Sequence, residues 1–362
     1  KDDHAGLGDW EATKTKLPGG VPALVKSAQD AGVKFGIWIE PEMVNPKSEL
    51  YEKHKNWVIE QPNRKTYYYR NQLVLDLANP EVQNYVFGVV DRLMTENPNI
   101  AYFKWDCNSP ITNIYSPYEK AQQGNMYIDY VRGLYKVLDR IHAKYPKLEM
   151  MLCSGGGARC DYQALKYFGE LWASDDTDPF ERLYIQWSLS KFFPVKAIAA
   201  HVTNWNKKTS VKFRTDVASM CKLGFDIDLK TMSPDDYKYT QGAVANWRRL
   251  EGVILDGEQY RLVSPYESNH AAVDYVSQDK QKAVVFAYDL HPRYEEPLRN
   301  VRLQGLDADK TYTVKEINLM PNTESKLAFN GQRFTGDYLM KVGLGILTFT
   351  EGTSHVLELT AE

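Results

Sequence analysis

The chain has 362 residues, of which 43% are hydrophobic and 25% are charged, an ordinary balance for a globular protein with one large and one small domain. Its formal net charge of −3 gives no electrostatic reason to expect nucleic acid or an acidic membrane as a partner. No segment approaches about 18 consecutive apolar residues, so no transmembrane helix is expected. Aromatic residues make up 12%, which suits a large core and also offers ring faces for sugar stacking.

Residues 1–230 alternate short apolar strands with helices, a pattern typical of parallel strand–helix units. The predicted strands are Lys34–Ile39, Leu73–Leu77, Ile100–Trp105, Leu148–Cys153, Glu170–Ala173, Ala197–His201 and Gly224–Leu229. The predicted helices are Val21–Ala31, Pro80–Met94, Met126–Lys144, Phe180–Lys191 and Ser210–Cys221. Seven strands are one short of an eight-stranded barrel, so we predict a (β/α)8 TIM-type barrel that lacks its first strand in this chain.

In such barrels the active site lies at the carboxyl ends of the strands. The predicted strands are followed there by polar or flexible groups, which predicts a shared functional rim. These groups are Glu40-Pro-Glu42, Asp76, Asp106, Ser154–Gly157, Asp175 and His201. A lone histidine is more often a structural hydrogen-bonding group, and His201 is read that way.

From about residue 260 the apolar pattern changes to period two, after a predicted helix over Ser233–Val253. The predicted strands here are Ala271–Ser277, Lys282–Tyr288, Asn300–Leu303, Thr311–Asn318, Gly345–Thr350 and Ser354–Thr360. Turn residues separate them, which indicates a small antiparallel β-sandwich with a polar exterior. We therefore predict a catalytic barrel over residues 1–258, incomplete at its N-terminus, and a C-terminal sandwich over residues 259–362.

Lys104 and Asp106 stand two residues apart on a predicted strand and so project from the same face. The cation is expected to lower the pKa of the carboxyl group and keep it ionised, as a glycosyl nucleophile requires. A purely structural Lys–Asp pair at the end of the strand is the alternative.

The run Ser174-Asp175-Asp176-Thr177-Asp178 places three acids in five residues. Crowded carboxyl groups raise one another's pKa, so one of them is expected to stay protonated as a proton donor. Calcium binding and helix capping are the alternatives, and Asp178 before Pro179 suits a helix cap. The residues alone do not distinguish Asp175 from Asp176 as the donor.

Further strand ends carry weaker signals. The glycine run Cys153–Gly157 lets the backbone approach a ligand, or is simply a tight loop. Trp38 could form the floor of a sugar site or seal the barrel, and Arg70 could bind sugar hydroxyls or hold a carboxylate. No metal or disulfide spacing links the four cysteines, for which we expect free thiols: Cys107, Cys153, Cys160 and Cys221.

Two carboxylates from separate strands are the minimum needed to hydrolyse a glycosidic bond. Taken together, these stretches resemble glycoside hydrolase family 36, the larger microbial α-galactosidases of melibiase and raffinose type. The β-rich tail is similar to the family's C-terminal sandwich. The matching segments, in the family's order, are Gly36–Val44, Arg70–Leu77, Lys104–Asp106, Cys153–Gly157 with Arg159 and Asp161, and Ser174–Asp178 with Arg182.

The resemblance implies that Asp106 is the nucleophile and Asp175 the acid/base, because the family pattern leaves the next position free. It implies retaining hydrolysis of terminal α-linked galactose in oligosaccharides or glycoconjugates, with no metal and no organic cofactor. The carboxyl groups of Asp106 and Asp175 would then lie roughly 5–6 Å apart. The implied substrate-binding residues are Trp38, Arg70, Lys104, Cys153, Gly155, Gly156, Asp178 and Arg182.

One departure from the family pattern concerns the start of the chain. Family members carry an N-terminal β-sandwich and a first barrel strand that ends in paired acids, whereas this chain opens beyond it, at Lys1–Trp10. We expect the missing N-terminal part to come from the same longer protein or from another chain. The sequence leaves open a homo-oligomer and whether the compartment is cytoplasmic or periplasmic.

The sequence is also compatible with other functions. The same family pattern could serve N-acetylgalactosaminides, galactosaminides or galactosyl transfer. A non-catalytic galactoside-binding fragment is a reading of another class, and a metal-dependent aldolase-like barrel is a third.

Overall fold

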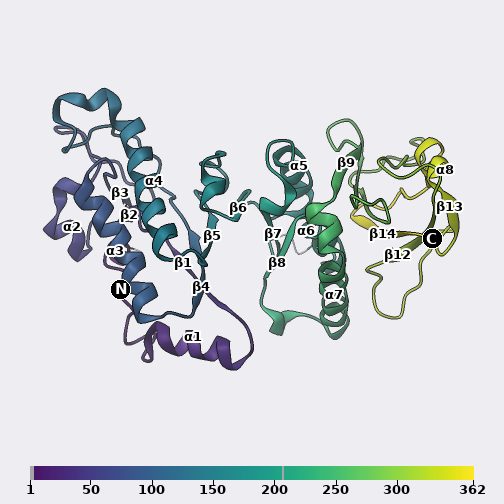
Figure 1. Ribbon diagram of the computed structural model, residues 1–362, viewed down its shortest axis with the longest axis horizontal. Coiled ribbons are helices and arrows are strands. Elements are labelled where there is room, and N and C mark those ends of the chain that lie inside the picture. Colours follow the sequence, from purple (N-terminus) through teal and green to yellow (C-terminus); the bar gives the residue numbers. More distant parts are fainter. Residues whose placement is uncertain (1–3, 206–207) are drawn as a thin grey trace. The chain divides into compact units, whose positions relative to one another are not determined.

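The computed structural model describes residues 4–205 and 208–362 (Figure 1). The chain divides into two compact units, the first ending at Trp172 and the second beginning at Ala173. The first three residues of the opening run lie outside the described residues. The domain boundary expected at residues 258 and 259 stays a prediction.

Four parallel strands form the sheet of the first unit, and each matches a predicted strand within a few residues. In sheet order they are β1 (Phe35–Ile39), β4 (Ile100–Trp105), β5 (Glu149–Leu152) and β6 (Glu170–Trp172). The α-helices are α1 (Gly20–Asp30), α2 (Glu49–Lys53), α3 (Pro80–Glu96) and α4 (Met126–Lys144). Short 3-10 helices lie at Lys55–Trp57, Lys120–Asn125 and Ala164–Lys166.

Local chemistry explains where α3 starts and how closely α4 packs. The Asn79 side chain accepts the N–H of Glu81 at 2.9 Å, and Pro80 occupies the first turn of α3. In the middle of α4, a Cβ atom at Gly133 would come within 1.8 Å of the Leu77 carbonyl oxygen. Glycine is therefore required there for α4 to lie against the chain that precedes α3.

The strand predicted at Leu73–Leu77 is wrong as a member of the parallel sheet. Only Leu73–Val74 forms a strand, β3, and it pairs antiparallel with β2 (Met43–Val44) in a separate two-stranded sheet. A short buried apolar run looks the same in the sequence wherever its backbone pairs. The described residues thus hold six parallel strands, four here and two in the second unit, where seven were predicted.

In the second unit an α/β segment precedes an antiparallel sheet. Its parallel pair is β7 (Ile198–Thr203) and β8 (Lys222–Asp226). Its helices are α5 (Pro179–Leu189), α6 (Val211–Ala218) and α7 (Pro234–Asp256), with 3-10 helices at Val195–Ala197 and Leu229–Thr231. None of the helices in the described part of the chain is both long and apolar enough to cross a membrane.

The antiparallel region that the sequence predicts is confirmed as a single six-stranded sheet. Its strand order is β13 (Arg333–Thr335), β12 (Thr311–Ile317), β14 (Thr353–Ala361), β11 (Lys282–Asp289), β10 (His270–Val276) and β9 (Glu258–Val263), and α8 (Gly336–Lys341) follows β13. The predicted strands 300–303 and 345–350 do not form, apart from an isolated bridge between Val301 and Leu344.

The polar exterior predicted for these strands is also wrong, because β10 is buried along its whole length and β11 along almost all of it. One face of the sheet, with Val273 and Phe286, packs against residues of α5, α6 and α7. The opposite face, with Val285, packs against the irregular chain that carries Val301 and Leu344. Period-two alternation identifies the two faces of a strand but not what covers each face.

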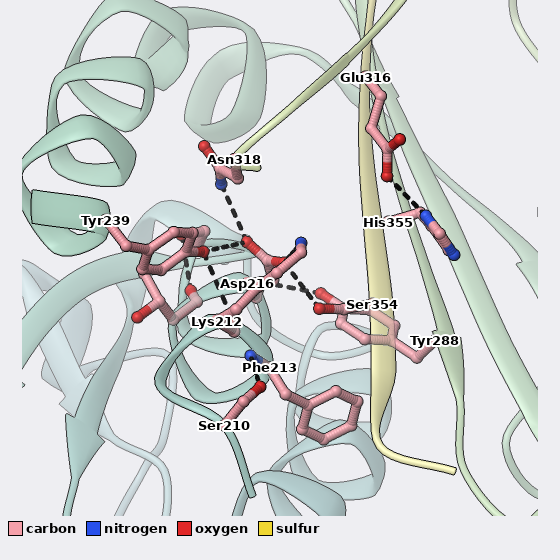
Figure 2. Close-up of polar contacts among 12 residues, drawn as sticks. Ser210, Lys212, Phe213, Asp216, Tyr239, Tyr288, Glu316, Asn318, Ser354 and His355 are labelled. Atoms are coloured by element: carbon pink, nitrogen blue, oxygen red, sulfur yellow. Dashed lines mark hydrogen bonds and ion pairs between the residues drawn. The ribbon is translucent and has the colours of Figure 1, made fainter. Parts of the chain in front are cut away.

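A fully buried carboxylate, Asp216 on α6, fastens α6 to α7 and to the antiparallel sheet (Figure 2). Its Oδ1 accepts hydrogen bonds from Tyr239 on α7 at 3.0 Å and from Asn318, just after β12, at 2.9 Å. Its Oδ2 accepts from Lys212 Nζ at 2.5 Å and from Ser354 on β14 at 2.7 Å. Both oxygens therefore have two donors, as a buried charge requires.

We expect Asp216→Asn to lower the free energy of unfolding by about 3 kcal/mol, because Lys212 loses its partner in a largely buried site. Urea-induced unfolding followed by circular dichroism measures the change. Asp30→Asn is the matched control, since it breaks an exposed pair with Lys26 and should cost less than about 0.5 kcal/mol. Equal losses in the two variants would contradict the assigned role of Asp216.

A second buried acid, Asp274 on β10, makes the stability of the second unit depend on pH. Burial raises the pKa of Asp274 from 3.8 to about 8, although the N–H of Gln304 donates to Oδ2 at 3.0 Å. Among the described residues, Oδ1 has no hydrogen-bond partner. Because the pKa is higher in the folded state, the stability associated with this group is complete below about pH 4 and falls as the pH rises to about 8.

Asp274→Asn should remove this dependence, since an amide does not ionise. We expect the free energy of unfolding of the variant, relative to the wild type, to increase by about 2–4 kcal/mol between pH 5 and pH 8. Urea titrations at the two pH values measure it. A relative stability that stays constant or decreases with pH would show that Asp274 is ionised in the folded protein.

Candidate active site

The ends of β1, β4 and β5 lie next to one another in the first unit and carry several predicted site residues. Trp38 on β1 pairs in register with Lys104 on β4. Backbone hydrogen bonds continue past the strands, since the N–H of Asp106 donates to the Ile39 carbonyl and the N–H of Cys153 donates to the last residue of β4, each at 2.8 Å. Asp106 and Cys153 therefore follow adjacent strands at the carboxyl end of the sheet.

Asp106 is only 6% exposed and is surrounded by hydrogen-bond donors. Trp38 Nε1 donates to Oδ2 at 3.0 Å, and the N–H of Cys107 donates to Oδ1 at 2.9 Å. The Asn108 side chain and the Cys153 thiol donate as well. Burial acts to raise the pKa of Asp106, but the four hydrogen bonds outweigh it and hold the pKa below its ordinary value. The carboxylate is thus fixed in place and ionised.

Hydrogen bonds, and not the expected charge of Lys104, are the main causes that lower the pKa of Asp106. The Nζ atom of Lys104 instead lies 4.6 Å from the centroid of the Trp172 ring, a cation–π contact. Burial and then the charge of Asp106 raise the pKa of the Cys153 thiol to about 12, against a smaller lowering by Lys104. Cys153 therefore stays protonated and can donate to Asp106.

Arg70 occupies a strained turn. Arg70 and Asn71 have φ angles of 51° and 57°, in the left-handed region that non-glycine residues seldom adopt. The N–H of Gln72 donates to the Tyr69 carbonyl at 2.9 Å and closes the turn. The Arg70 side chain is exposed, with Cζ 5.7 Å from the centroid of the Tyr69 ring. Strain of this kind is maintained at sites where a side chain must be aimed.

The glycine run after β5 is a tight loop braced against the Asp106 segment. Gly155 and Gly156 have φ angles of 56° and 94°, and the N–H of Ser154 donates to the Gly156 carbonyl at 2.8 Å. The Ser154 hydroxyl donates to the carbonyl of Cys107 at 2.7 Å. Side chains other than hydrogen would be disfavoured at both glycines, of which Gly155 is exposed and Gly156 is buried.

Glu42 is completely buried and accepts hydrogen bonds from three side chains around the end of β4. Trp105 Nε1 donates to Oε1 at 2.8 Å, while Tyr130 OH and Arg159 Nη1 donate to Oε2 at 2.5 and 2.9 Å. Arg159 also donates from Nε to the Ser154 hydroxyl at 3.1 Å. The ion pair therefore connects β1, β4, α4 and the glycine loop.

The acidic run of the second unit folds on itself so that Asp175 is exposed. The Asp178 carboxylate caps α5 by accepting the N–H of Phe180 at 2.9 Å, which confirms the helix cap that the sequence suggested. The Asp176 carboxylate accepts the N–H of Asp178 at 2.9 Å, and the hydroxyl of Ser174 accepts the N–H of Asp176 at 3.1 Å. The neighbouring polar groups thus shape the loop that carries Asp175.

Arg182 is 2% exposed and supports this loop, and its expected role in substrate binding stays a prediction. Its Nε donates to the Asp176 carbonyl at 2.7 Å and its Nη2 to the Ser174 carbonyl at 2.6 Å. Burial lowers the pKa of Arg182 to about 10, which leaves it charged at neutral pH. Arg182 therefore stabilises the loop through its two carbonyl groups.

Two other predicted rim residues have structural surroundings. Asp76 is buried, and its Oδ2 accepts the Ser116 hydroxyl at 2.5 Å while burial raises its pKa. His201 lies within β7 opposite Gly224, where a Cβ atom would come within 2.4 Å of the His201 ring. Glycine at 224 makes room for this ring.

Sequence reasoning missed Glu40 and Asn108 as a linked pair, and it missed Trp205. Trp205 is 64% exposed just beyond β7, and its N–H donates to the hydroxyl of Thr203 at 3.2 Å. Thr203 in turn shares a 2.8 Å hydrogen bond with Thr177 in the Asp175 loop. A tryptophan four residues after the predicted strand 197–201 was the available signal.

All four cysteines are free thiols, as predicted. Within residues 4–205 and 208–362 no group of three or more His, Cys, Asp or Glu side chains is placed to hold a metal ion. The separation of roughly 5–6 Å expected between the Asp106 and Asp175 carboxyl groups joins residues of different units and stays a prediction.

Comparison with known proteins identifies relatives along the whole chain. The family model described as Melibiase matches residues 1–257, and the model described as Glycosyl hydrolase family 36 C-terminal domain matches residues 270–359. Alpha-galactosidase AgaA of Geobacillus stearothermophilus is 34% identical over 351 residues, which cover 95% of this chain and 46% of AgaA. Alpha-galactosidase 1 of Pediococcus pentosaceus is 36% identical over 350 residues, covering 94% of this chain and 46% of the relative.

Solved structures agree with these matches. The crystal structure of AgaA has a TM-score of 0.91 at 33% identity and covers 100% of this chain, which covers 49% of AgaA. The chain spans about half the length of the curated relatives it matches. Its fold class is as predicted, an incomplete TIM-type α/β barrel followed by an antiparallel β domain.

Trp38→Phe should raise the pKa of Asp106, because it keeps an aromatic ring but removes the Nε1–H donor to Oδ2. Carboxyl 13C NMR titration measures the shift. Trp10→Phe is the matched control, since the Trp10 ring lies 6.0 Å from that of Trp38. An unchanged Asp106 pKa in Trp38→Phe, or an equal rise in both variants, would show that the indole N–H does not stabilise the carboxylate.

Proposed function

This chain belongs to glycoside hydrolase family 36, the melibiase family, and on that premise we propose that its protein hydrolyses terminal α-linked galactose with retention of configuration. The observation that carries the proposal is the Asp106 carboxylate, held ionised by four hydrogen bonds at the carboxyl end of a parallel strand. A fixed, charged oxygen is what attack on an anomeric carbon requires.

In the first step Asp106 attacks the anomeric carbon and the bond to the glycosidic oxygen breaks. Asp175 donates its proton to that departing oxygen, and an ester joins galactose to Asp106. In the second step Asp175 takes a proton from water, whose oxygen attacks the same carbon and displaces the Asp106 carboxylate. Two inversions give net retention, and both acids return to their starting states.

The exposure of Asp175 and the bracing of its loop support the acid/base role. A proton donor must reach the leaving oxygen and then water, which an exposed carboxyl group can do. Arg182 and Asp178 act in this proposal as positioning residues, since Arg182 holds the loop carbonyls and Asp178 caps α5.

The substrate proposed is an α-galactoside oligosaccharide. AgaA variants have been crystallised in complex with raffinose and with stachyose, and the same class of substrate is proposed here by relation. The proposed sugar-contacting groups are the Trp38 ring, which is 42% exposed, the Arg70 and Lys104 cations, and the edge of the Cys153–Gly156 loop. Because the chain spans about half of its relatives, the activity is proposed for the full-length protein.

Tests of variants with azide distinguish the roles of Asp106 and Asp175. Asp106→Ala should lower turnover of raffinose by at least about 1,000-fold, and with azide and an aryl α-galactoside it should form β-galactosyl azide, because azide enters from the side that Asp106 vacated. Asp175→Ala should retain turnover of an activated aryl galactoside and form α-galactosyl azide. Product configuration by 1H NMR measures both outcomes.

Retained raffinose hydrolysis in Asp106→Ala would refute the nucleophile, and the same azide anomer from both variants would refute the division of roles. Parallel assays with aryl α-N-acetylgalactosaminide test the related specificity. Galactose binding without turnover in the wild type would identify a binding protein instead.

A further inference from the structure

Glu40 is a buried acid that the proposed reaction does not use. It follows β1 directly, is 1% exposed and has hydrogen-bond donors at both carboxylate oxygens. Oε1 accepts from the N–H of Asn108 at 2.7 Å and from Asn108 Nδ2 at 2.8 Å. Oε2 accepts from Gln72 Nε2 at 3.0 Å. A carboxylate with three donors and almost no contact with water is a fixed junction between chain segments.

The Asn108 side of this junction leads to Asp106. Asn108 follows the nucleophile by two residues, and its side chain donates to the Asp106 carboxylate as well as to Glu40. The amide nitrogen has two hydrogens, so it can serve both acids at once. Glu40 thereby fixes the orientation of a group that orients Asp106.

The Gln72 side leads to Arg70. Gln72 closes the turn in which Arg70 and Asn71 adopt positive φ angles, by donating its N–H to the Tyr69 carbonyl. Its side chain is tied to Glu40 Oε2 at 3.0 Å. A turn strained at two consecutive residues persists only where its surroundings hold it, and this contact connects the turn to the end of β1.

We propose that Glu40 is a positioning residue that holds the Asp106 carboxylate, through Asn108, and the Arg70 turn, through Gln72, in a fixed relation to each other. The inference rests on the proposed function, in which Asp106 is the nucleophile and Arg70 contacts the sugar. The two connections are separate, so each can be broken alone.

The charge state of Glu40 determines which substitution preserves the junction. Burial, with a contribution from the charge of Asp106, raises the pKa of Glu40 to about 7, while the hydrogen bonds from Asn108 and Gln72 act against it. A neutral amide is therefore a fair replacement. Gln72 Oε1 has no hydrogen-bond partner among the described residues, so rotation of its amide can present an acceptor to a glutamine at position 40.

The test is a comparison of kcat and KM for raffinose in four variants of the full-length protein. Asn108→Ala should lower kcat by about 10-fold with little change in KM, and Gln72→Ala should raise KM by about 10-fold with little change in kcat. Glu40→Ala should show both effects. Glu40→Gln should recover both parameters to within about threefold of the wild type. Glu96→Ala, at the exposed end of α3, is the control.

A structural role alone would lower the melting temperature of Glu40→Ala without dividing the effects on kcat and KM between Asn108→Ala and Gln72→Ala. That result, or a Glu40→Gln variant as impaired as Glu40→Ala, would overturn the proposal.

Hydrogen exchange supplies a readout that does not need turnover. The amides of Asn108 and Gln72 should exchange at least about 10-fold faster in Glu40→Ala than in Glu40→Gln, because Glu40 accepts the first and stabilises the turn closed by the second. Equal exchange in the two variants would refute the junction itself. If the wild type shows no galactosidase turnover but exchange follows the expected order, the proposed function fails and the junction stands.

Discussion

Three carboxylates buried where β1 and β4 end impose the main constraint on the first unit. Glu40, Glu42 and Asp106 are each at most 6% exposed, so water cannot supply the hydrogen bonds that their charges require. The protein supplies donors instead, including the indole N–H groups of Trp38 and Trp105. The buried acids thus explain why Trp38 and Trp105 point their indole N–H groups toward this end of the sheet.

The second unit follows the same rule on a larger scale. Asp216 is satisfied by residues up to 138 positions away in the sequence, and its four donors come from α6, α7, β14 and the chain after β12. The contact makes α6 part of the packing of the antiparallel sheet. A local sequence pattern cannot reveal such a contact, because nothing near Asp216 signals its distant partners.

The elements that the sequence predicted correctly are those with strong local signals. Met126–Lys144 has a clear helical period and forms α4 with the same bounds, and Asp178 before Pro179 forms a helix cap. The motif ending at Asp106 was placed correctly at the carboxyl end of a parallel strand. Periodicity and capping are local properties, so one sequence is enough to find them.

The features that the sequence did not predict depend on contacts between segments that are distant in the sequence. Leu73–Leu77 is apolar and buried, yet its pairing partner is β2 rather than the parallel sheet. Lys104 shares a strand face with Asp106, but Trp172 on β6 offers its side chain a nearby ring. Spacing along a strand identifies the face on which a side chain lies. The neighbour that the side chain contacts depends on the adjacent strands.

The ion pair between Glu42 and Arg159 has an electrostatic consequence for the surroundings of Asp106. Glu42 is compensated by a guanidinium, and Glu40 has a pKa of about 7 and is partly neutral, although both acids are hydrogen-bonded to residues near Asp106, namely Trp105 and Asn108. The negative potential is therefore concentrated on one oxygen pair instead of being spread over three acids. In the proposed reaction, an oxocarbenium-like centre next to Asp106 would meet a localised anion, which would favour positive charge at the anomeric carbon.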